Sequence, residues 1–303
     1  MQTAERTHAV SSPATTPEVA VDTLPLSTRF TLGPAITPVQ RAFFDRHGFI
    51  LFGAVATPAE LAAIDAEVRR IQDHWLSERR TKVFGIPLFV GKDHAGRPFI
   101  QRFAFTSMFS DPIRDFVRDA RFEPIRKLVG DRARVGDNER DGVVFNRNLN
   151  VPGTAYKALG WHTDGLRDLV YLKKIAPQLN VGLHFDRCTA TTGGLRILPG
   201  THNQGMWPTL FRKAYFLDQR PDPAEIPIET EPGDLTVHDG RAWHRVERSP
   251  LTGPESLRRT MYVPYLTDAF APKNEASPTP PYHTLGMGVR KVRAWAAAAR
   301  KVR

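Results

Sequence analysis

The chain is poor in the features that mark secreted and membrane proteins. Cys188 is its only cysteine, so neither an intrachain disulfide nor a zinc site built from several thiolates can form. No apolar run approaches the roughly eighteen residues of a membrane-spanning helix, and the first residues lack the basic-then-apolar pattern of a secretory signal. From these absences we expect a soluble, cytoplasmic protein without a membrane partner.

Charge and proline content set further limits. Lys and Arg outnumber Asp and Glu by 42 to 32, which gives a formal net charge of +10. Residues 290–303 hold six basic residues and no acidic one, so much of this excess lies in one terminal segment. The 25 prolines favour strands, turns and loops over a helical bundle. A chain of 303 residues is long enough to bury one sizeable core.

The chain divides into one expected domain and two terminal segments. Residues 1–27, rich in Thr, Ala, Pro and Ser, predict a flexible tail. Residues 28–271 predict a single domain. Residues 272–303 predict a proline-rich linker followed by a basic helix. Within the domain, Thr37-Pro and Thr57-Pro open capped helices, the second running to about residue 79. Shorter helices are predicted at residues 112–117 and 124–129.

A short motif and a distant histidine give the strongest functional signal. One residue separates His162 from Asp164, and His244 lies in a later segment. Side chains two positions apart on a strand share a face, so both can reach one metal ion. Two imidazoles and one carboxylate form the facial triad of non-haem Fe(II) oxygenases, which leaves three coordination positions open. The three residues therefore predict an iron site, with His244 arriving from a distant strand.

The segments around this motif are typical of strands and turns. Residues 180–186 alternate between polar and apolar side chains, and residues 192–202 predict a turn, a short strand and a second turn. The turn at residues 231–234 leads into the strand that we expect to carry His244. Arg258 opens a β-branched and aromatic run, where its guanidinium could bind a dicarboxylate in bidentate fashion.

Taken together, these motifs resemble the phytanoyl-CoA dioxygenase (PhyH-like) family of Fe(II)/2-oxoglutarate-dependent oxygenases, over about residues 38–266. The matching residues are His162, Asp164, the stretch 193–202, Gly233, Asp234, His244 and Arg258. The resemblance implies a mostly β fold with flanking helices, whose core at about residues 140–266 is a double-stranded β-helix, the cupin-like jelly roll. One departure is Val246, because the family often has a small hydroxyl residue two positions after the distal histidine.

The resemblance also implies residues for the cosubstrate 2-oxoglutarate. Arg258 would pair with its far carboxylate, and the strand before the metal motif would help to hold it. On that strand Asn146, Asn148 and Asn150 share one face, and buried amides need hydrogen-bond partners that a dicarboxylate can supply. Asn146 and Asn148 are therefore candidates for binding the cosubstrate. Exposure of this face at a sheet edge is the alternative.

Four further polar residues are candidates for contact with an acidic substrate. They lie in an extended aromatic stretch before the core or close to the motifs, and each has a surface or salt-bridge role as its alternative. They are Gln101, Arg102, Arg167 and Arg196.

Three other histidines are rival candidates for metal ligands: His184, His202 and His238. His238 precedes His244 by six positions, and on one straight strand the two would lie about 20 Å apart at ~3.3 Å per residue. That distance is too long for a shared ion. We expect His184 to be half-buried on its strand and His202 to lie in a turn.

The expected activity follows from the motif and the resemblance. We expect an Fe(II)/2-oxoglutarate-dependent dioxygenase that uses O2 to hydroxylate a small, anionic molecule, such as an amino acid derivative or a biosynthetic intermediate. Succinate and CO2 would be released. Because Asp164 keeps the carboxylate position, no halide site remains and hydroxylation is expected over halogenation. No catalytic residue is predicted beyond the metal ligands.

Two other classes of function stay open. A double-stranded β-helix without catalysis would act as a binding or regulatory module, and an iron titration would separate it from an enzyme. The net charge suggests an oxygenase that acts on nucleic acid, but the core lacks a continuous basic and aromatic face. We therefore expect a small-molecule partner and no nucleic acid, while homo-oligomerisation stays open.

Overall fold

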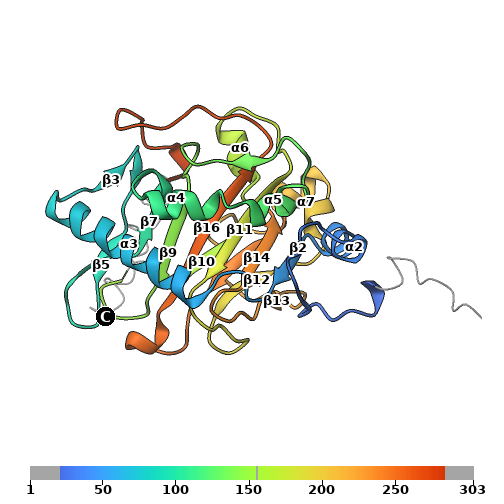
Figure 1. The fold of residues 1–303 in the computed structure, drawn as a ribbon, viewed down its shortest axis with the longest axis horizontal. Coiled ribbons are helices and arrows are strands. Elements are labelled where there is room, and N and C mark those ends of the chain that lie inside the picture. Colours follow the sequence, from blue (N-terminus) through green and yellow to red (C-terminus); the bar gives the residue numbers. More distant parts are fainter. Residues whose placement is uncertain (1–20, 155, 284–303) are drawn as a thin grey trace, which may run out of the picture.

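The computed structural model describes residues 21–154 and 156–283, most of whose strands fall in two sheets (Figure 1). The larger sheet has the order β1-β2-β14-β11-β16-β9-β7, with β8 paired to β16. β1 and β2 are parallel, and the remaining pairs of this sheet are antiparallel. Its strands are β1 (Arg29–Phe30), β2 (Phe49–Phe52), β7 (Arg102–Phe103), β8 (Arg134–Val135), β9 (Val144–Asn148), β11 (Gln178–His184), β14 (Leu235–Asp239) and β16 (Arg258–Leu266).

The smaller sheet has the order β10-β15-β12-β13. Its strands are β10 (Leu159–His162), β12 (Gly194–Ile197), β13 (Ile226–Pro227) and β15 (His244–Glu247). From β9 onward the chain crosses repeatedly between the two sheets, which is the winding of a double-stranded β-helix. The predicted fold class is thus confirmed. Two separate hairpins pair β3 (Lys82–Val83) with β4 (Ile86–Pro87) and β5 (Val90–Lys92) with β6 (Pro98–Ile100).

Helices from the first half of the chain lie across the larger sheet (Figure 1). Thr37 and Thr57 cap their helices as predicted, and each does so with a capping box, since the threonine side chain and the side chain three residues later bind each other's backbone amides. The α-helices are α2 (Pro38–His47), α3 (Pro58–Ser77), α4 (Asp111–Val117), α5 (Glu123–Arg126), α6 (Leu166–Val170) and α7 (Met206–Phe211). Short 3-10 turns are η1 (Thr106–Met108), η2 (Ala120–Phe122), η3 (Thr201–Asn203) and η4 (Gly253–Ser256).

The two faces of the larger sheet differ in character. Apolar side chains of β9, β11, β14 and β16 enter the main hydrophobic core together with those of the helices, and they include Phe145, Val181, Val237 and Met261. Alternation along a strand turns the next residues to the opposite face, where polar side chains meet the smaller sheet across a cavity. Asn146, Asn180 and Tyr262 lie on this face. A polar interior is costly to bury, so it indicates a binding site.

The segment before His244 corrects one expectation. We predicted a single strand from the turn at residues 231–234 to His244, but β14 ends at Asp239 and β15 begins at His244 in the other sheet. A tight turn separates them, since the amide of Ala242 donates to the carbonyl of Asp239 at 2.9 Å. The Asp239 carboxylate also accepts the amide of Arg241 at 2.9 Å. The reversal brings residues of β14 and β15 close together.

The terminal predictions are only partly within the described residues. Of the predicted tail 1–27, residues 1–20 lie outside them, whereas Val21 is buried in the hydrophobic core. The predicted basic helix at residues 290–303 also lies outside them, so its conformation stays a prediction. Among the helices that are described, none is long and apolar enough to cross a membrane.

Candidate metal centre and cavity

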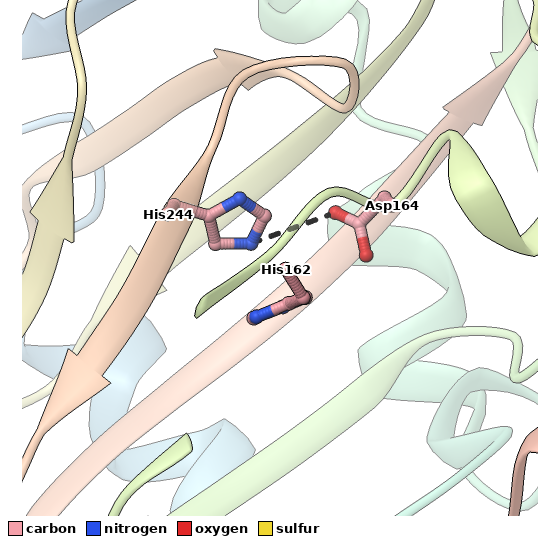
Figure 2. A group of neighbouring side chains, drawn as sticks. All are labelled: His162, Asp164 and His244. Atoms are coloured by element: carbon pink, nitrogen blue, oxygen red, sulfur yellow. Dashed lines mark ion pairs between the residues drawn. The ribbon is translucent and has the colours of Figure 1, made fainter. Parts of the chain in front are cut away.

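Three predicted ligands meet at one end of the two sheets (Figure 2). His162 ends β10 and His244 opens β15, and the two residues are direct partners in the antiparallel register. Asp164 follows two positions later in a bend beyond the end of β10, so the prediction that both residues lie on one strand was wrong, although both side chains reach the same site. One ligand atom from each residue can be chosen so that all three lie within 4.8 Å of one another. The triad predicted from the sequence is therefore assembled, and all three residues are buried.

Backbone carbonyls orient both imidazoles. The Nδ1 atom of His162 lies 2.8 Å from the carbonyl of Gly160, and that of His244 lies 3.0 Å from the carbonyl of Ala242. A neutral ring that donates through Nδ1 keeps the lone pair on Nε2 for a metal ion. Burial lowers the pKa of both histidines, with that of His162 lowered further by His244, so the neutral ligand form is favoured.

The carboxylate of Asp164 is held on both of its oxygens. Arg167 forms an ion pair with Oδ1, and the Asn180 amide donates to Oδ2 at 2.9 Å. Oδ2 lies 3.9 Å from Nε2 of His244, so it is the oxygen that faces the imidazoles (Figure 2). Burial alone would raise the pKa of Asp164, but Arg167 and the imidazoles hold it far below its usual value. An ionised carboxylate and two neutral imidazoles are a donor set that fits Fe(II) and leaves open positions.

A cavity of about 640 Å³ opens beside the triad. Its volume falls in the range of small-molecule sites. The metal ligands and several charged side chains line one part of it. Apolar and aromatic side chains line much of the rest, among them Phe89, Val144, Tyr156, Leu159, Phe216 and Leu217. The arrangement suits a molecule with an apolar body that is held beside the metal site.

The residues proposed for the cosubstrate lie on neighbouring strands. Arg258 of β16 pairs in register with Asn148 of β9, and Asn146 lies two positions further along. Arg258 is buried; its Nη1 donates to the carbonyl of Glu247 at 2.9 Å, whereas its Nε has no partner among the described residues. A side chain at Gly193 would place its Cβ only 2.7 Å from Nη1, so glycine makes room for the guanidinium.

Asn146 and Asn148 have different surroundings. Asn146 lines the cavity, and its Oδ1 is buried without a partner in the described part of the chain. Asn148 is not in the cavity wall, and its amide donates to the carbonyl of Tyr156 at 3.4 Å. Arg258 is not in the wall either. Orphaned polar atoms on Arg258 and Asn146 are compatible with a bound carboxylate between the sheets.

The four candidate substrate contacts separate into two pairs. Arg102 and Arg167 line the cavity. Gln101 does not; it is fully buried, and its Oε1 accepts the amide of Tyr156 at 3.0 Å. Arg196 is also outside the cavity wall, where it forms an ion pair with Glu247 of the neighbouring strand. The structure therefore brings only the first pair close to the metal ligands.

Asp141 organises the charged part of the wall. Its carboxylate accepts from Arg102 at 2.7 Å, from Arg167 at 3.3 Å and from the Tyr282 hydroxyl at 2.8 Å, and it lies 3.5 Å from Nε2 of His283. Burial would raise the pKa of Asp141, but Arg102, His283 and Arg167 hold it well below its usual value. The wall thus contains a second buried, ionised carboxylate.

Asp141, Tyr282 and His283 are site residues that no sequence motif indicated. Tyr282 and His283 follow the proline-rich residues 272–281, for which we predicted only a linker, yet both line the cavity. No local pattern marks them, because their role depends on contacts with the distant residue Asp141. Arg140 was missed as well; it donates to the backbone carbonyl of Asp164 at 2.7 Å.

The predicted distance between His238 and His244 was wrong. Their ring centroids lie 4.5 Å apart, since the turn after Asp239 reverses the chain. His184 is buried rather than half-buried, with Nε2 3.0 Å from the Thr236 hydroxyl. His202 lies in η3, as expected for a turn, but is buried against Gly48.

Solved structures share this fold at low sequence identity. HygX from Streptomyces hygroscopicus, with nickel and 2-oxoglutarate bound, is 16% identical, with 81% of this chain and 90% of that chain covered and a TM-score of 0.55. EctD from S. alaskensis in its apoform is 17% identical, with 85% and 88% covered and a TM-score of 0.56. SnoN, a non-heme alpha ketoglutarate dependent epimerase from nogalamycin biosynthesis, is 17% identical, with 78% and 85% covered and a TM-score of 0.54.

A search of curated protein sequences finds no match. Comparison with protein families matches residues 44–249 to the family described as phytanoyl-CoA dioxygenase (PhyH). This match spans more than half of the 303 residues and includes all three ligands of the candidate metal centre. The chain therefore belongs to the phytanoyl-CoA dioxygenase (PhyH) family.

Proposed function

We propose that this protein is an Fe(II)/2-oxoglutarate-dependent dioxygenase that hydroxylates an unactivated C–H bond of a small, anionic molecule. The observation that carries the proposal is the buried triad, in which the Nε2 lone pairs of His162 and His244 are kept free beside the ionised carboxylate of Asp164. Membership of the PhyH family supports it, as does the nickel and 2-oxoglutarate bound in the similarly folded HygX.

The triad would hold the iron, and the rest of the cavity would hold and orient the organic molecules. Fe(II) with 2-oxoglutarate supplies O2 activation for C–H oxidation, with succinate and CO2 as coproducts. The chain's own contribution is to keep two imidazoles neutral, to fix one carboxylate and to shield the reacting group from water.

Arg258 is the residue that we assign to the far carboxylate of 2-oxoglutarate. Its buried Nε lacks a partner among the residues described, and a guanidinium can bind a carboxylate through two parallel hydrogen bonds. Val246 lines the cavity two positions after His244 and offers no hydroxyl, so any further hydrogen bond must come from elsewhere. Asn146 is the candidate, because it lines the same cavity with an unpartnered amide oxygen.

Arg102 is the residue that we assign to an anionic group of the substrate. Its Nη2 binds Asp141, but its Nη1 is buried without a partner in residues 21–154 and 156–283. Arg167 is less available, because two carboxylates already bind it. An apolar body would then contact aromatic residues such as Phe89 and Phe216 in the remaining wall.

The first test is an anaerobic titration of the purified protein with Fe(II) and 2-oxoglutarate. The ternary complex should give a weak metal-to-ligand charge-transfer band, which should vanish in His162→Ala. Absence of the band from correctly folded wild-type protein would exclude the proposed chemistry and favour a non-catalytic binding module.

Substitutions of the neighbouring residues Arg258 and Arg259 test which of the two binds 2-oxoglutarate. Arg259 points to the other face of β16, where it binds Asp186 at 2.7 Å and Asp65 at 3.2 Å. Arg258→Gln should raise the 2-oxoglutarate concentration needed for half of the band by about 10-fold or more, because a charged hydrogen bond is lost. Arg259→Gln should leave this concentration unchanged in folded protein. Equal effects would contradict the assignment.

Substrate and reaction outcome need a separate screen. Succinate release should be stimulated by some carboxylic acids and not by their neutral amides, and Arg102→Gln should remove this preference. Product analysis by mass spectrometry then distinguishes a gain of one oxygen atom from an isomer of unchanged mass. The comparison matters because SnoN, of similar fold, is an epimerase.

A further inference from the structure

His238 is a buried histidine beside the metal ligands that the proposed mechanism does not use. It lies on β14 opposite Asn180 of β11, so its side chain shares the polar interior face. Only 1% of the residue is exposed. Its ring centroid lies 4.5 Å from that of His244, and its Nε2 lies 3.9 Å from Oδ2 of Asp164. His238 does not line the cavity. It therefore contacts the triad from the protein interior between the two sheets.

Both ring nitrogens of His238 lack a hydrogen-bond partner among the described residues. An imidazole carries at least one N–H donor in either protonation state, so at least one donor of His238 is unpaired inside the protein. An unpaired buried donor costs free energy, and such groups are rare in folded proteins unless a water molecule, ion or ligand completes them. His184 lies on the same interior face and has a hydrogen-bond partner, as buried histidines usually do, because its Nε2 contacts the Thr236 hydroxyl.

Asp164 cannot become the partner of His238 once a metal ion is bound. Each carboxylate oxygen offers two lone pairs. Oδ2 already accepts the amide of Asn180, and as the oxygen that faces His244 it would give its second lone pair to the metal. Oδ1 is occupied by Arg167. With a metal ion bound, His238 therefore has no hydrogen-bond partner among the contacts of the described residues, and an oxygen atom that enters with the metal ion could supply one.

We propose that His238 is a positioning residue of the metal centre, whose N–H donates a hydrogen bond to an oxygen atom that enters together with the metal ion. This inference rests on the proposed function, because that function supplies the metal and its oxygen ligands. The oxygen belongs either to water or to the carboxylate of 2-oxoglutarate, and titrations with Fe(II) alone and with both molecules distinguish the two sources. Residues that act in this way on metal sites are typically worth about 10- to 100-fold in affinity.

The test compares His238→Phe, which keeps an aromatic ring without a nitrogen, with His238→Gln, which restores an N–H donor. For each, we would measure the Kd for Fe(II) with and without 2-oxoglutarate under anaerobic conditions, the charge-transfer band, and the Tm of the metal-free protein. His184→Gln is the matched control, because it replaces a buried interior histidine that already has a partner.

We expect His238→Phe to weaken Fe(II) binding but not to destabilise the metal-free protein. His238→Phe should weaken Fe(II) binding by about 10-fold or more, and His238→Gln should recover most of the loss. The metal-free protein should be as stable in His238→Phe as in wild type, or more so, because an unpaired buried nitrogen has been removed. If the weakening occurs only with 2-oxoglutarate present, the partner is its carboxylate; if it occurs with Fe(II) alone, the partner is water.

Three outcomes would overturn the proposal. Unchanged Fe(II) affinity and an unchanged band in folded His238→Phe would show that the nitrogen has no role at the metal. Weaker binding together with a lower Tm of the metal-free protein, without recovery in His238→Gln, would show that the residue acts through packing. Wild-type protein that binds no Fe(II) would instead refute the proposed function itself, and this inference with it. If His238→Phe does not fold, His238→Leu takes its place.

Discussion

Arg167 binds Asp164 and Asp141 at the same time, so a single guanidinium joins a metal ligand to the wall of the cavity. The pairing helps to keep both buried carboxylates ionised, together with Arg102 beside Asp141 and the imidazoles beside Asp164. Burial would lower the pKa of Arg167, but Asp164 and Asp141 raise it above its usual value, so the residue stays charged. A group that binds in the cavity near Asp141 is thereby connected with the metal site through one side chain.

Arg167→Gln should weaken the metal centre without removing a ligand. The uncharged amide cannot hold the Asp164 carboxylate as firmly, and we expect the Kd for Fe(II) to rise about 10-fold. Anaerobic titration measures this change. Arg97→Gln is the control, since Arg97 forms a similar pair with Asp93 but is exposed and outside the cavity wall. An unchanged Kd in folded Arg167→Gln would show that Asp164 needs no help from Arg167.

Asp141→Ala should lower the free energy of unfolding by much more than Tyr282→Phe does. Asp141→Ala leaves Arg102 and Arg167 without their shared partner in a buried wall, and breaking such a pair costs about 3–5 kcal/mol. Tyr282→Phe removes one hydrogen bond to Asp141 and should cost only about 1 kcal/mol. Urea unfolding measures both.

The control for this series is Asp131→Ala, whose partner Lys127 is also on the surface, and it should change the free energy of unfolding by less than about 0.5 kcal/mol. A Tyr282→Phe variant that unfolds like Asp141→Ala would contradict the idea that Asp141 is held mainly by the arginines.

The buried His184 should make the protein less stable in mild acid. Burial lowers its pKa to about 4, whereas in the unfolded chain the usual value of 6.5 applies. Between these values the unfolded state binds a proton that the folded state does not, so stability falls as pH falls from about 6.5 to 4. At about 1.4 kcal/mol per pKa unit, the contribution of His184 is roughly 3 kcal/mol.

Urea unfolding across this pH range tests the prediction. His184→Gln keeps a polar contact to Thr236 without a titratable ring, and its pH dependence should be weaker than that of wild type. His94→Gln, at an exposed position, should leave the dependence as it is. The same slope in wild type and His184→Gln would show that other groups cause the acid sensitivity.

Features set by neighbouring residues could be predicted from the sequence. The predicted helix caps at Thr37 and Thr57 were confirmed, since each involves residues only three positions apart. The alternation along β9 was confirmed in the same way, with Phe145 in the hydrophobic core and Asn146 at the cavity. Backbone geometry fixes both patterns locally, whatever the rest of the chain does.

The boundary between β14 and β15 was missed, although Asp239-Gly240 is a dipeptide typical of turns and lies where β14 ends. The dipeptide marks a turn, but it does not show that the strands on its two sides join different sheets. For that reason His238, expected about 20 Å from His244, is its close neighbour.

By itself, the sequence determined which residues are candidates to meet a metal ion and which face of β9 would be polar. The residue types His162, Asp164 and His244 indicated the first, and strand alternation indicated the second. Only the tertiary structure decided which distant groups surround the metal ligands. It places Asp141 beside Arg167, Tyr282 beside Asp141, and the His238 ring next to that of His244. Contacts between distant segments depend on strand order and register, which are set by packing of the whole chain and leave no local pattern.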